Sequence, residues 1–324
     1  MNERSLGLIR KRPLGRTGLE IAPLVFGGNV FGWTVDQQTA FMLLDRFVEG
    51  GLNAIDTADA YSTWVPGNQG GESETIIGNW FKASPARREK MVLITKVGAQ
   101  LVEDKKGLSA KRIAEAAENS WRRLQTDYID LYLSHRPDPE TPVDETLRAY
   151  ENLIRQGKVK AIGASNYNAV QLREALTIAS KQCLPRYEVL EPEYNLYDRS
   201  GYEGELRDLC IEEGLGVITY YSLASGFLSG KYRSQDDLGK SVRGRGASKY
   251  LNDRGFRILH ALDTVAGVHG AAPAEVALAW LIAREGVTAP IASATNVQQV
   301  DSLIRAAHLR LSISDTELLS AASG

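Results

Sequence analysis

The chain has only two cysteines, almost no net charge and no long hydrophobic run. Cys183 and Cys210 are not spaced as metal ligands are, so we expect reduced, buried thiols and no metal site. A formal net charge of −2 gives no basis for binding nucleic acid or an anionic membrane surface. No apolar run reaches the ~18 residues of a transmembrane helix, and residues 1–12 lack the hydrophobic stretch of a secretory signal. These absences predict a cytoplasmic protein.

The composition is that of a folded chain with a large core. Hydrophobic residues make up 43% of the sequence and charged residues 24%, which is typical of globular proteins. A length of 324 residues fits either one large domain or two ordinary ones. No linker rich in Pro, Ser or Gly divides the chain. We therefore expect a single domain over residues 1–324.

Short apolar runs alternate with helix-like segments about eight times along the chain. The runs are apolar on both faces, as in parallel strands that are covered by helices. Eight such units favour an α/β fold, a closed (β/α)8 TIM barrel, while an open doubly wound sheet stays the alternative. The expected strands are residues 24–26, 54–57, 91–95, 129–134, 159–163, 189–192, 216–220 and 289–292. The expected helices are residues 37–50, 73–82, 109–124, 143–156, 169–180 and 201–213, with two extra helices near the C-terminus at 273–284 and 297–306.

Two segments fall outside this repeat. Residues 12–21 hold Gly15 and Gly18 in a turn-rich context and predict an N-terminal β-hairpin before the first barrel strand. Residues 229–252 predict a long polar loop after the seventh strand, and a structureless loop of this length is usually functional. Barrel enzymes place their sites in the loops that follow the strands. We therefore expect this loop to be a lid.

Four polar side chains stand at or just after the ends of three consecutive expected strands. Asp56 ends the second strand, Tyr61 follows five residues later, Lys96 ends the third strand and His135 follows the fourth. Singly, each has a structural explanation, such as a cap, a packing ring or a buried histidine. Together they would meet at one barrel rim. A free phenol has a pKa of about 10, and a nearby cation lowers it, so the set predicts an enzyme that protonates a carbonyl oxygen.

The chain resembles the aldo-keto reductases over nearly its whole length. Beside the four residues above, the resemblance is carried by several stretches that occur in the right order at suitable spacing. These stretches are GGESETIIG (70–78), RQGKVKAIGASN (155–166), EPEYNLYDR (191–199), GFLSGKYR (226–233) and PIASATNVQQV (290–300).

The resemblance implies a reversible, NAD(P)H-dependent reduction of aldehydes or ketones to alcohols. Tyr61 would be the general acid, and Lys96 would lower its pKa. Asp56 would hold Lys96 in position, and His135 would orient and polarise the carbonyl group. For oxidation of an alcohol the roles reverse, with Tyr61 as the base.

No G-x-G-x-x-G follows a strand, so the usual dinucleotide motif is missing. The resemblance explains this, because aldo-keto reductases bind the nicotinamide cofactor on a barrel rim without a Rossmann fold. It implies that Ser165 and Asn166 hold the carboxamide and that Tyr220 stacks on the nicotinamide ring. Glu191 stands where many relatives carry Gln. The other residues assigned to the cofactor are Tyr221, Ser222 and Leu223 along the pyrophosphate, and Ser293, Ala294, Thr295, Asn296 and Gln299 in the last cofactor loop.

The last cofactor loop has no cation, which bears on the preference between NADP(H) and NAD(H). Many NADPH-using relatives carry Lys or Arg in the last cofactor loop, where this chain has Ser293 and Gln299. Polar side chains and the amides of a helix N-terminus can still bind a 2′-phosphate, so we expect NADP(H) to be preferred, with NAD(H) also open. The long loop offers compensating charges on Arg243, Arg245 and Lys249.

The substrate side is less informative. Trp33 and Trp64 follow the first strand and Tyr61, and either can wall a pocket for a small carbonyl or alcohol compound or only cover the rim. Two other functions stay open: a cofactor-binding redox sensor that resembles the β subunits of potassium channels, and a lyase acting through a Schiff base on Lys96. Fold alone does not separate these functions. Monomer and small homo-oligomer are both compatible with the sequence.

Overall fold

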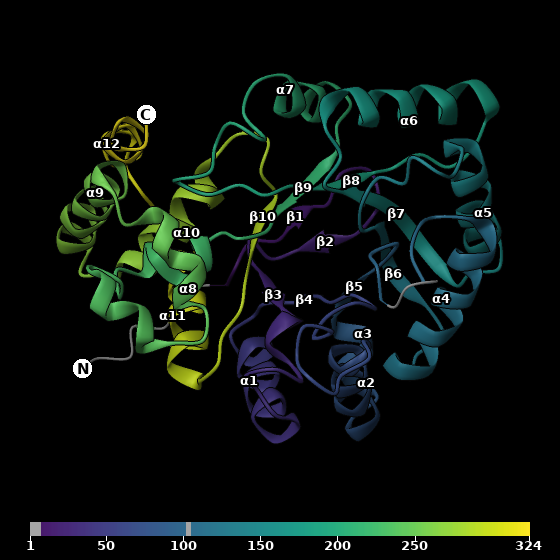
Figure 1. Ribbon diagram of the computed structural model, residues 1–324, viewed down its shortest axis with the longest axis horizontal. Helices are drawn as coiled ribbons and strands as arrows, with labels where there is room; N and C mark the ends of the chain where they lie inside the picture. The colour runs from purple at the N-terminus through teal and green to yellow at the C-terminus, as the bar shows by residue number, and fades with distance from the viewer. Residues whose placement is uncertain (1–7, 102–104) are drawn as a thin grey trace.

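The computed structural model describes residues 8–101 and 105–324. Its centre is a closed barrel of eight parallel strands in the order β10-β3-β4-β5-β6-β7-β8-β9 (Figure 1). The expected (β/α)8 barrel is therefore confirmed, and the open sheet is excluded. The strands are β3 (Val25–Gly27), β4 (Ala54–Asp56), β5 (Val92–Val97), β6 (Ile129–Ser134), β7 (Val159–Ser165), β8 (Val189–Glu191), β9 (Gly216–Thr219) and β10 (Ala289–Ala292).

The N-terminal hairpin is also confirmed and lies against the barrel. Strands β1 (Arg12–Pro13) and β2 (Glu20–Ile21) pair antiparallel. Leu14 and Ile21 are fully buried and belong to the same apolar cluster as the side chains inside the barrel. Gly15 has a positive φ of 58°, and a Cβ there would approach the Glu188 carbonyl oxygen at 2.5 Å. A glycine is required at this turn because both the backbone conformation and the close approach exclude a side chain.

Helices cover the outside of the barrel, with apolar faces packed on the strands. Several begin at a polar cap: the Ser109 side chain accepts from the Arg112 amide at 3.3 Å, and Asn168 accepts from the Gln171 amide at 2.9 Å. Such caps satisfy amides that have no partner inside the helix. The helices expected from the sequence are α1 (Gln37–Glu49), α2 (Glu72–Ala83), α4 (Ala110–Leu124), α5 (Val143–Arg155), α6 (Ala169–Gln182), α7 (Glu205–Glu212), α10 (Pro273–Ala283) and α11 (Val297–His308).

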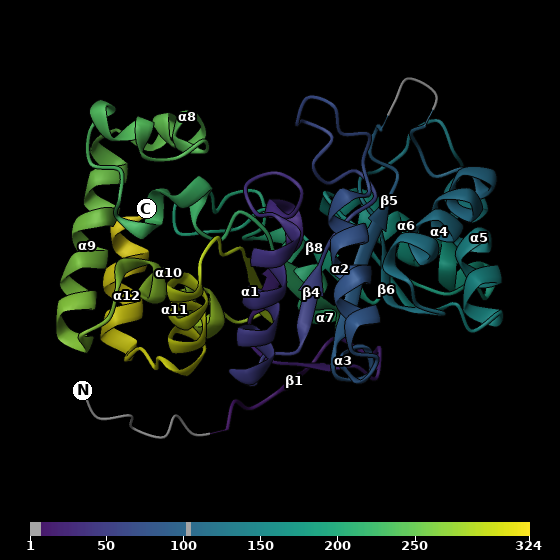
Figure 2. The ribbon, with the colours of Figure 1, turned by 90° about the horizontal axis from the view of Figure 1, so that it is seen from below.

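Outside the 229–252 segment, the described chain has three α-helices that were not expected: α3 (Ala86–Lys90), α9 (Asp253–His269) and α12 (Ile313–Ala322). Figure 2 shows α9 and α12 beside α10 and α11, on the opposite side of the molecule from α4 and α5. In α9 the buried residues Ile258, Leu262 and Val265 recur at helical spacing, and the Asn252 side chain accepts from the Gly255 amide at 3.0 Å. The periodicity and the cap were both present in the sequence.

The expectation of a structureless loop at residues 229–252 is wrong. The segment folds into short turns of helix: η2 (Ala224–Ser229) leads into it, and η3 (Gln235–Lys240), α8 (Gly244–Ala247) and η4 (Ser248–Tyr250) follow. A Cβ on Gly244 would lie 1.8 Å from the Leu238 carbonyl oxygen, so close packing between these turns depends on glycine. Helices this short leave little periodicity to read from a sequence.

Two smaller expectations are corrected as well. Cys210 is buried, but Cys183 is exposed at the C-terminal end of α6, so only one thiol is in the core. The helix expected from residue 201 begins at Glu205, because Gly204 has a φ of 90° and breaks the helical path.

Across residues 8–101 and 105–324, no single helix has the length and apolar character needed to cross a membrane. Only α9 and α10 taken together meet that criterion, and they are bent by 94° where they join. Of residues 1–12, for which no secretory signal is expected, residues 1–7 lie outside the part of the chain that the structure describes.

Candidate active site

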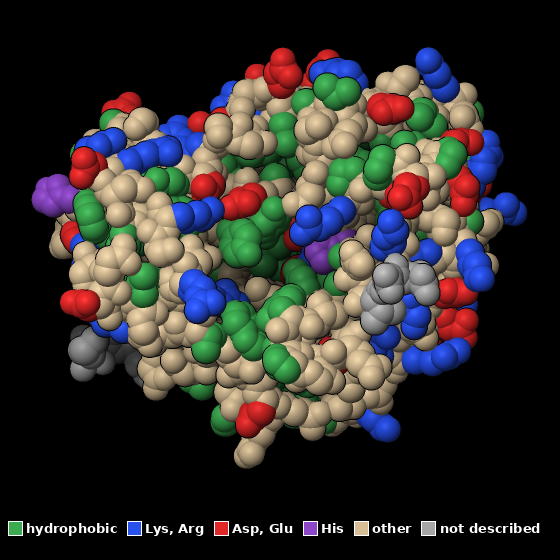
Figure 3. Space-filling view, in the orientation of Figure 1, with side chains coloured by type: hydrophobic (Ala, Val, Ile, Leu, Met, Phe, Trp, Pro, Cys, Tyr) green, Lys and Arg blue, Asp and Glu red, His purple; other side chains and the backbone are tan. Residues whose placement is uncertain are grey.

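The four residues singled out from strand ends meet at one rim of the barrel. Asp56 is the last residue of β4, Lys96 lies on β5, Tyr61 lies in the turn after β4, and His135 directly follows β6. This convergence follows from the topology, because the carboxyl ends of parallel barrel strands all open on the same face. Figure 3 shows a hollow at the centre of the molecule, bordered by hydrophobic side chains, basic side chains and a histidine.

Lys96 bonds to three neighbouring groups of the site. Its Nζ donates to Asp56 Oδ1, to Tyr61 Oη at 2.8 Å and to the Thr57 carbonyl oxygen at 3.1 Å. Tyr61 Oη in turn donates to Asp56 Oδ2 at 2.8 Å. An ammonium group has three protons to donate, and all three have acceptors here. Such a lysine is poorly suited to act as a Schiff-base nucleophile, which needs a free amine.

The electrostatics around Tyr61 differ from the expectation. Burial raises the pKa of Tyr61 well above its usual value, and the acidic side chains of Asp56 and Glu191 raise it further. The expected lowering by Lys96 is therefore outweighed by a dry site that holds two acids. The phenol stays protonated throughout the physiological range, so its hydroxyl is available as a proton donor rather than as a phenolate.

His135 lies beside Tyr61, with 6.1 Å between the ring centroids. Burial, with help from Lys96 and Arg136, lowers the pKa of His135 to about 3. The imidazole is therefore neutral, with one nitrogen that donates and one that accepts. Its Nδ1 is buried and has no hydrogen-bond partner among the residues described. The backbone oxygen of His135 accepts from Asn166 Nδ2 at 2.9 Å.

Ser165, Asn166, Glu191 and Tyr220 form a second network that joins the first. Tyr220 Oη donates to Asn166 Oδ1 at 2.6 Å, and Asn166 Nδ2 reaches Ser165 Oγ at 3.1 Å. Asn166 has a positive φ of 64°, a backbone conformation that is uncommon outside glycine and is often found at functional sites. Glu191 Oε1 lies 3.4 Å from Lys96 Nζ, so the two networks share one buried cluster of charges.

The remaining residues assigned to the cofactor lie on the loops after β9 and β10. Tyr221 is 51% exposed, and the Ser222 hydroxyl donates to the Thr219 carbonyl oxygen at 2.9 Å. Leu223 is partly buried and Ala294 fully buried. In the last loop several side chains bond to one another: Thr295 Oγ1 donates to Gln299 Oε1 at 3.2 Å, Asn296 caps α11 through the Gln299 amide at 3.0 Å, and Ser293 Oγ donates to Asn29 Oδ1 at 2.6 Å.

Of the three compensating cations named from the 229–252 segment, Arg243, Arg245 and Lys249, only Arg243 approaches this loop. Arg243 Nη2 lies 3.3 Å from Asn29 Oδ1, the atom that also accepts from Ser293, and its guanidinium lies 5.1 Å from the centre of the Trp33 ring. Arg245 is exposed, and Lys249 pairs with Asp198 at 3.9 Å. Asn29 was missed from the sequence, although it lies only two residues after the end of β3.

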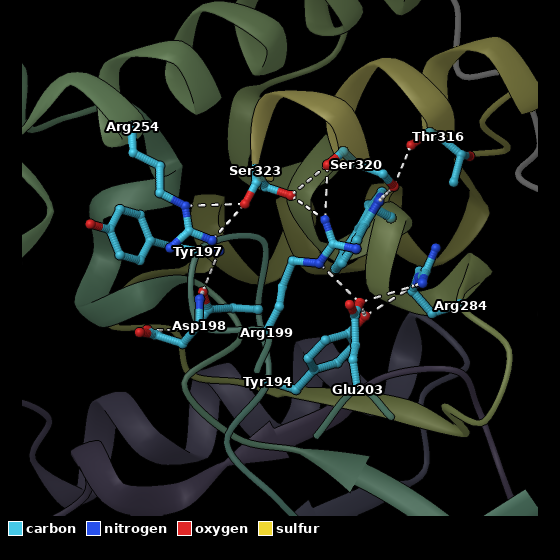
Figure 4. A network of polar contacts seen from close by, with 12 residues as sticks. Tyr194, Tyr197, Asp198, Arg199, Glu203, Arg254, Arg284, Thr316, Ser320 and Ser323 are labelled. Carbon is cyan, nitrogen blue, oxygen red and sulfur yellow. Dashed lines mark hydrogen bonds and ion pairs between the residues drawn. The ribbon is translucent and has the colours of Figure 1, made fainter. Parts of the chain in front are cut away.

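A separate polar network anchors the far end of the segment that carries Arg243 (Figure 4). Asn252 Nδ2 donates to Tyr197 Oη at 2.8 Å, and the Arg254 guanidinium lies over the Tyr197 ring. Arg254 also donates to the Ser323 carbonyl oxygen near the end of α12. The segment is thus fixed at its end by contacts with the loop after β8 and with the last helix.

Trp64 lies next to Tyr61, and Trp33 packs against Trp64. The Trp33 and Trp64 rings meet edge to face at 5.6 Å, and Trp64 lies 6.3 Å from the Tyr61 ring. Trp64 is 49% exposed. Within residues 8–101 and 105–324, no group of three or more His, Cys, Asp or Glu side chains is placed to hold a metal ion.

The closed barrel carries a paired tyrosine, lysine and aspartate and a neutral histidine at one rim. Together these groups can transfer a proton to or from an oxygen atom. The chain belongs to the aldo/keto reductase family, whose family model matches residues 23–323. It is an oxidoreductase of that family.

Individual relatives agree with this assignment. The chain is 36% identical over 314 residues to an uncharacterized oxidoreductase, YrpG, of Bacillus subtilis (strain 168), covering 94% of this chain and 92% of that protein. It is 35% identical over 295 residues to a probable voltage-gated potassium channel subunit beta of Oryza sativa subsp. japonica, covering 89% and 88% of the two. A stretch of 90 residues is 70% identical to an uncharacterized 11.2 kDa protein in the crtE 3′ region of Pseudescherichia vulneris, covering 28% and 87%.

Proposed function

We propose that the protein is an NAD(P)H-dependent reductase of aldehydes and ketones that also oxidises the corresponding alcohols. The observation that carries the proposal is the Tyr61 hydroxyl, which bonds both Lys96 Nζ and Asp56 Oδ2 at 2.8 Å beside a neutral His135. A hydroxyl that is protonated yet adjacent to an ammonium group can release its proton as charge develops on a carbonyl oxygen.

The rim residues fit a nicotinamide cofactor, which members of this family generally use. The buried Glu191 Oε2 has no partner among the residues described, and the strained Asn166 holds its side chain between Ser165 and Tyr220. These groups would hold the carboxamide end, and Tyr220 would stack on the ring. When bound, NAD(P)H supplies the hydride to the carbonyl carbon.

The protein's own residues do the rest of the chemistry. The neutral His135 donates a hydrogen bond to the carbonyl oxygen and orients it. Tyr61 transfers its proton to that oxygen, and the phenolate that remains is stabilised by Lys96 Nζ, already 2.8 Å away. Asp56 accepts from Lys96 and keeps it aimed at Tyr61. In alcohol oxidation the step reverses: Tyr61 first loses its proton, and its oxygen then accepts the proton of the alcohol.

The proposal is tested with purified protein, a reactive aldehyde such as 4-nitrobenzaldehyde, and either NADPH or NADH. We expect the near-ultraviolet absorbance of the reduced cofactor to fall in proportion to enzyme, with formation of the alcohol. Tight cofactor binding without turnover, across a panel of aldehydes and ketones, would contradict the reductase. It would favour a regulatory subunit that senses the cofactor, a second candidate suggested by the channel β subunits among the relatives.

Arg243 provides a test of the proposed preference for NADP(H). Its guanidinium shares Asn29 with Ser293, in the region proposed for the 2′-phosphate. Because a charge-assisted hydrogen bond contributes about 1.5–3 kcal/mol, Arg243→Met is expected to weaken NADPH binding about tenfold or more and NADH binding little. Quenching of tryptophan fluorescence measures both affinities, and the exposed Arg245 provides the control variant Arg245→Met. Equal weakening for both cofactors would contradict the phosphate assignment.

Location in the cytoplasm and oligomeric state stay predictions from composition. The substrate class is a small carbonyl or alcohol compound, for which Trp33 and Trp64 would form the apolar wall.

A further inference from the structure

Glu191 is proposed above to help hold the carboxamide, but it has no part in the proton transfer described there. It ends β8, and its backbone oxygen accepts from the Ser165 hydroxyl at 3.0 Å and from the Asn166 amide at 3.2 Å. Its side chain is only 3% exposed. Oε1 lies 3.4 Å from Lys96 Nζ, while Oε2 has no partner in the part of the chain that the structure describes. Glu191 is therefore fixed in place, while only one of its two carboxyl oxygens has a polar contact.

The charges in this cluster do not balance if every acid is ionised. Lys96 is one cation facing two carboxyl groups, and all three side chains are almost completely buried. An uncompensated charge in a dry site is costly, and such a group usually takes up a proton instead. The titratable groups that face Glu191 are Asp56 from β4, Lys96 from β5, Tyr61 from the turn after β4 and Tyr220 after β9.

Of the two acids, Glu191 rather than Asp56 takes up the proton. Asp56 accepts hydrogen bonds from both Lys96 Nζ and Tyr61 Oη, and both favour its ionised form. Glu191 receives only the longer contact from Lys96. Burial raises the pKa of both acids, and for Glu191 burial and the Asp56 carboxylate bring the pKa to about 8.

We propose that Glu191 is a neutral carboxylic acid in the active protein, and that its ionisation switches off proton donation by Tyr61. As a neutral acid it offers one donor and one acceptor, as a glutamine amide would. Once ionised, it adds a negative charge beside the Tyr61 phenolate that must form during reduction, and it competes with Asp56 for Lys96. Glu191 is thus a positioning residue that acts through Lys96 and Tyr61, and the switching part of the inference rests on the proposed reductase function.

The protonation state is tested without turnover by infrared difference spectroscopy of wild type against Glu191→Gln. At pH about 6.5, well below the Glu191 pKa of about 8, we expect a carbonyl stretch of a protonated carboxylic acid that is missing in the variant. The band should fade as pH rises through about 8. Glu203→Gln is the control, because hydrogen bonds from Arg199 and Tyr194 lower the pKa of that carboxyl (Figure 4). Absence of the band would overturn the proposal.

The switch is tested by the pH dependence of kcat. Wild type is expected to lose about tenfold in kcat as pH rises through the Glu191 pKa of about 8, since one added charge shifts a neighbouring group by one or more pKa units. Glu191→Gln should keep a flat profile there, with KM for the aldehyde unchanged. Glu191→Met should also be flat, at a lower rate, because it removes the charge and the hydrogen bonds together.

The outcomes separate the inference from the function on which it rests. If kcat fell equally at alkaline pH in wild type and Glu191→Gln, the switch would be overturned and the proposed reductase function would stand. The infrared band without turnover on any carbonyl compound would overturn the reductase and the switch, and would still assign the proton to Glu191.

Discussion

Tyr61→Phe is expected to remove carbonyl reduction almost completely, with kcat lower by about a thousandfold, the range in which general-acid catalysis contributes. The substitution deletes only the hydroxyl that bonds Lys96 and Asp56. The aromatic ring beside His135 and Trp64 remains, so the pocket keeps its shape. No other hydroxyl in the described part of the chain donates to Asp56 while accepting from Lys96, and none can replace Tyr61 as the donor.

The measurement is steady-state turnover together with cofactor affinity from fluorescence quenching. Cofactor affinity should stay within about twofold of wild type, because the substitution removes transition-state stabilisation rather than ground-state binding. The matched control is Tyr202→Phe, which removes a buried hydroxyl that donates to the Gly286 carbonyl oxygen away from the rim. Near-normal turnover of Tyr61→Phe would rule out the proposed acid, and a comparable loss in Tyr202→Phe would point to general destabilisation.

The barrel could be predicted because each strand stands out in the sequence as a short, mainly apolar run. Runs such as Ile129–Ser134 and Ala289–Ala292 begin and end at the residues that the structure gives. The rule that parallel strands need helical crossovers then fixed the architecture. The 229–252 segment lacked such a signal, because its single turns of helix are held by glycine contacts such as Gly244 with Leu238, which connect residues only after folding.

For the site, strand ends identified Asp56, Lys96 and His135, because topology alone brings such positions together. The electrostatics could not be predicted in the same way. A sequence gives the cation of Lys96 but not the burial of Tyr61, nor the approach of Glu191 to Lys96 from β8. The contact between Arg243 and Asn29 joins residues 214 positions apart, and no local pattern reports a contact of that kind.

Lys96 has two functions, and any single substitution of it changes both at once. It stabilises the phenolate of Tyr61, and it neutralises the Asp56 carboxylate, which cannot reach water. An effect on turnover alone would not separate these functions. Stability measurements do so, because the unfolded chain exposes the same acid to solvent, where it is ionised at little cost.

Lys96→Met is therefore expected to abolish turnover and also to lower the free energy of unfolding by about 3–5 kcal/mol, the cost of breaking a buried ion pair from one side. The loss should be larger at neutral than at acidic pH, where a protonated Asp56 needs no cation. Adding Asp56→Asn to Lys96→Met should recover most of the stability and none of the activity. Urea denaturation followed by circular dichroism measures both effects.

The control is Lys160→Met, since Lys160 pairs with Asp130 at 2.8 Å but is 47% exposed. Asp130 is buried, but it also pairs with Arg88 at 2.8 Å, so this variant leaves no buried carboxylate without a cation and should unfold close to wild type. If Lys96→Met were as stable as Lys160→Met, the Asp56 carboxyl would have to be neutral in the folded protein. The hydrogen bonds from Lys96 and Tyr61 to Asp56 would then stabilise no charge, and the proposed proton donor would lack the ionised partner that holds Lys96 against it.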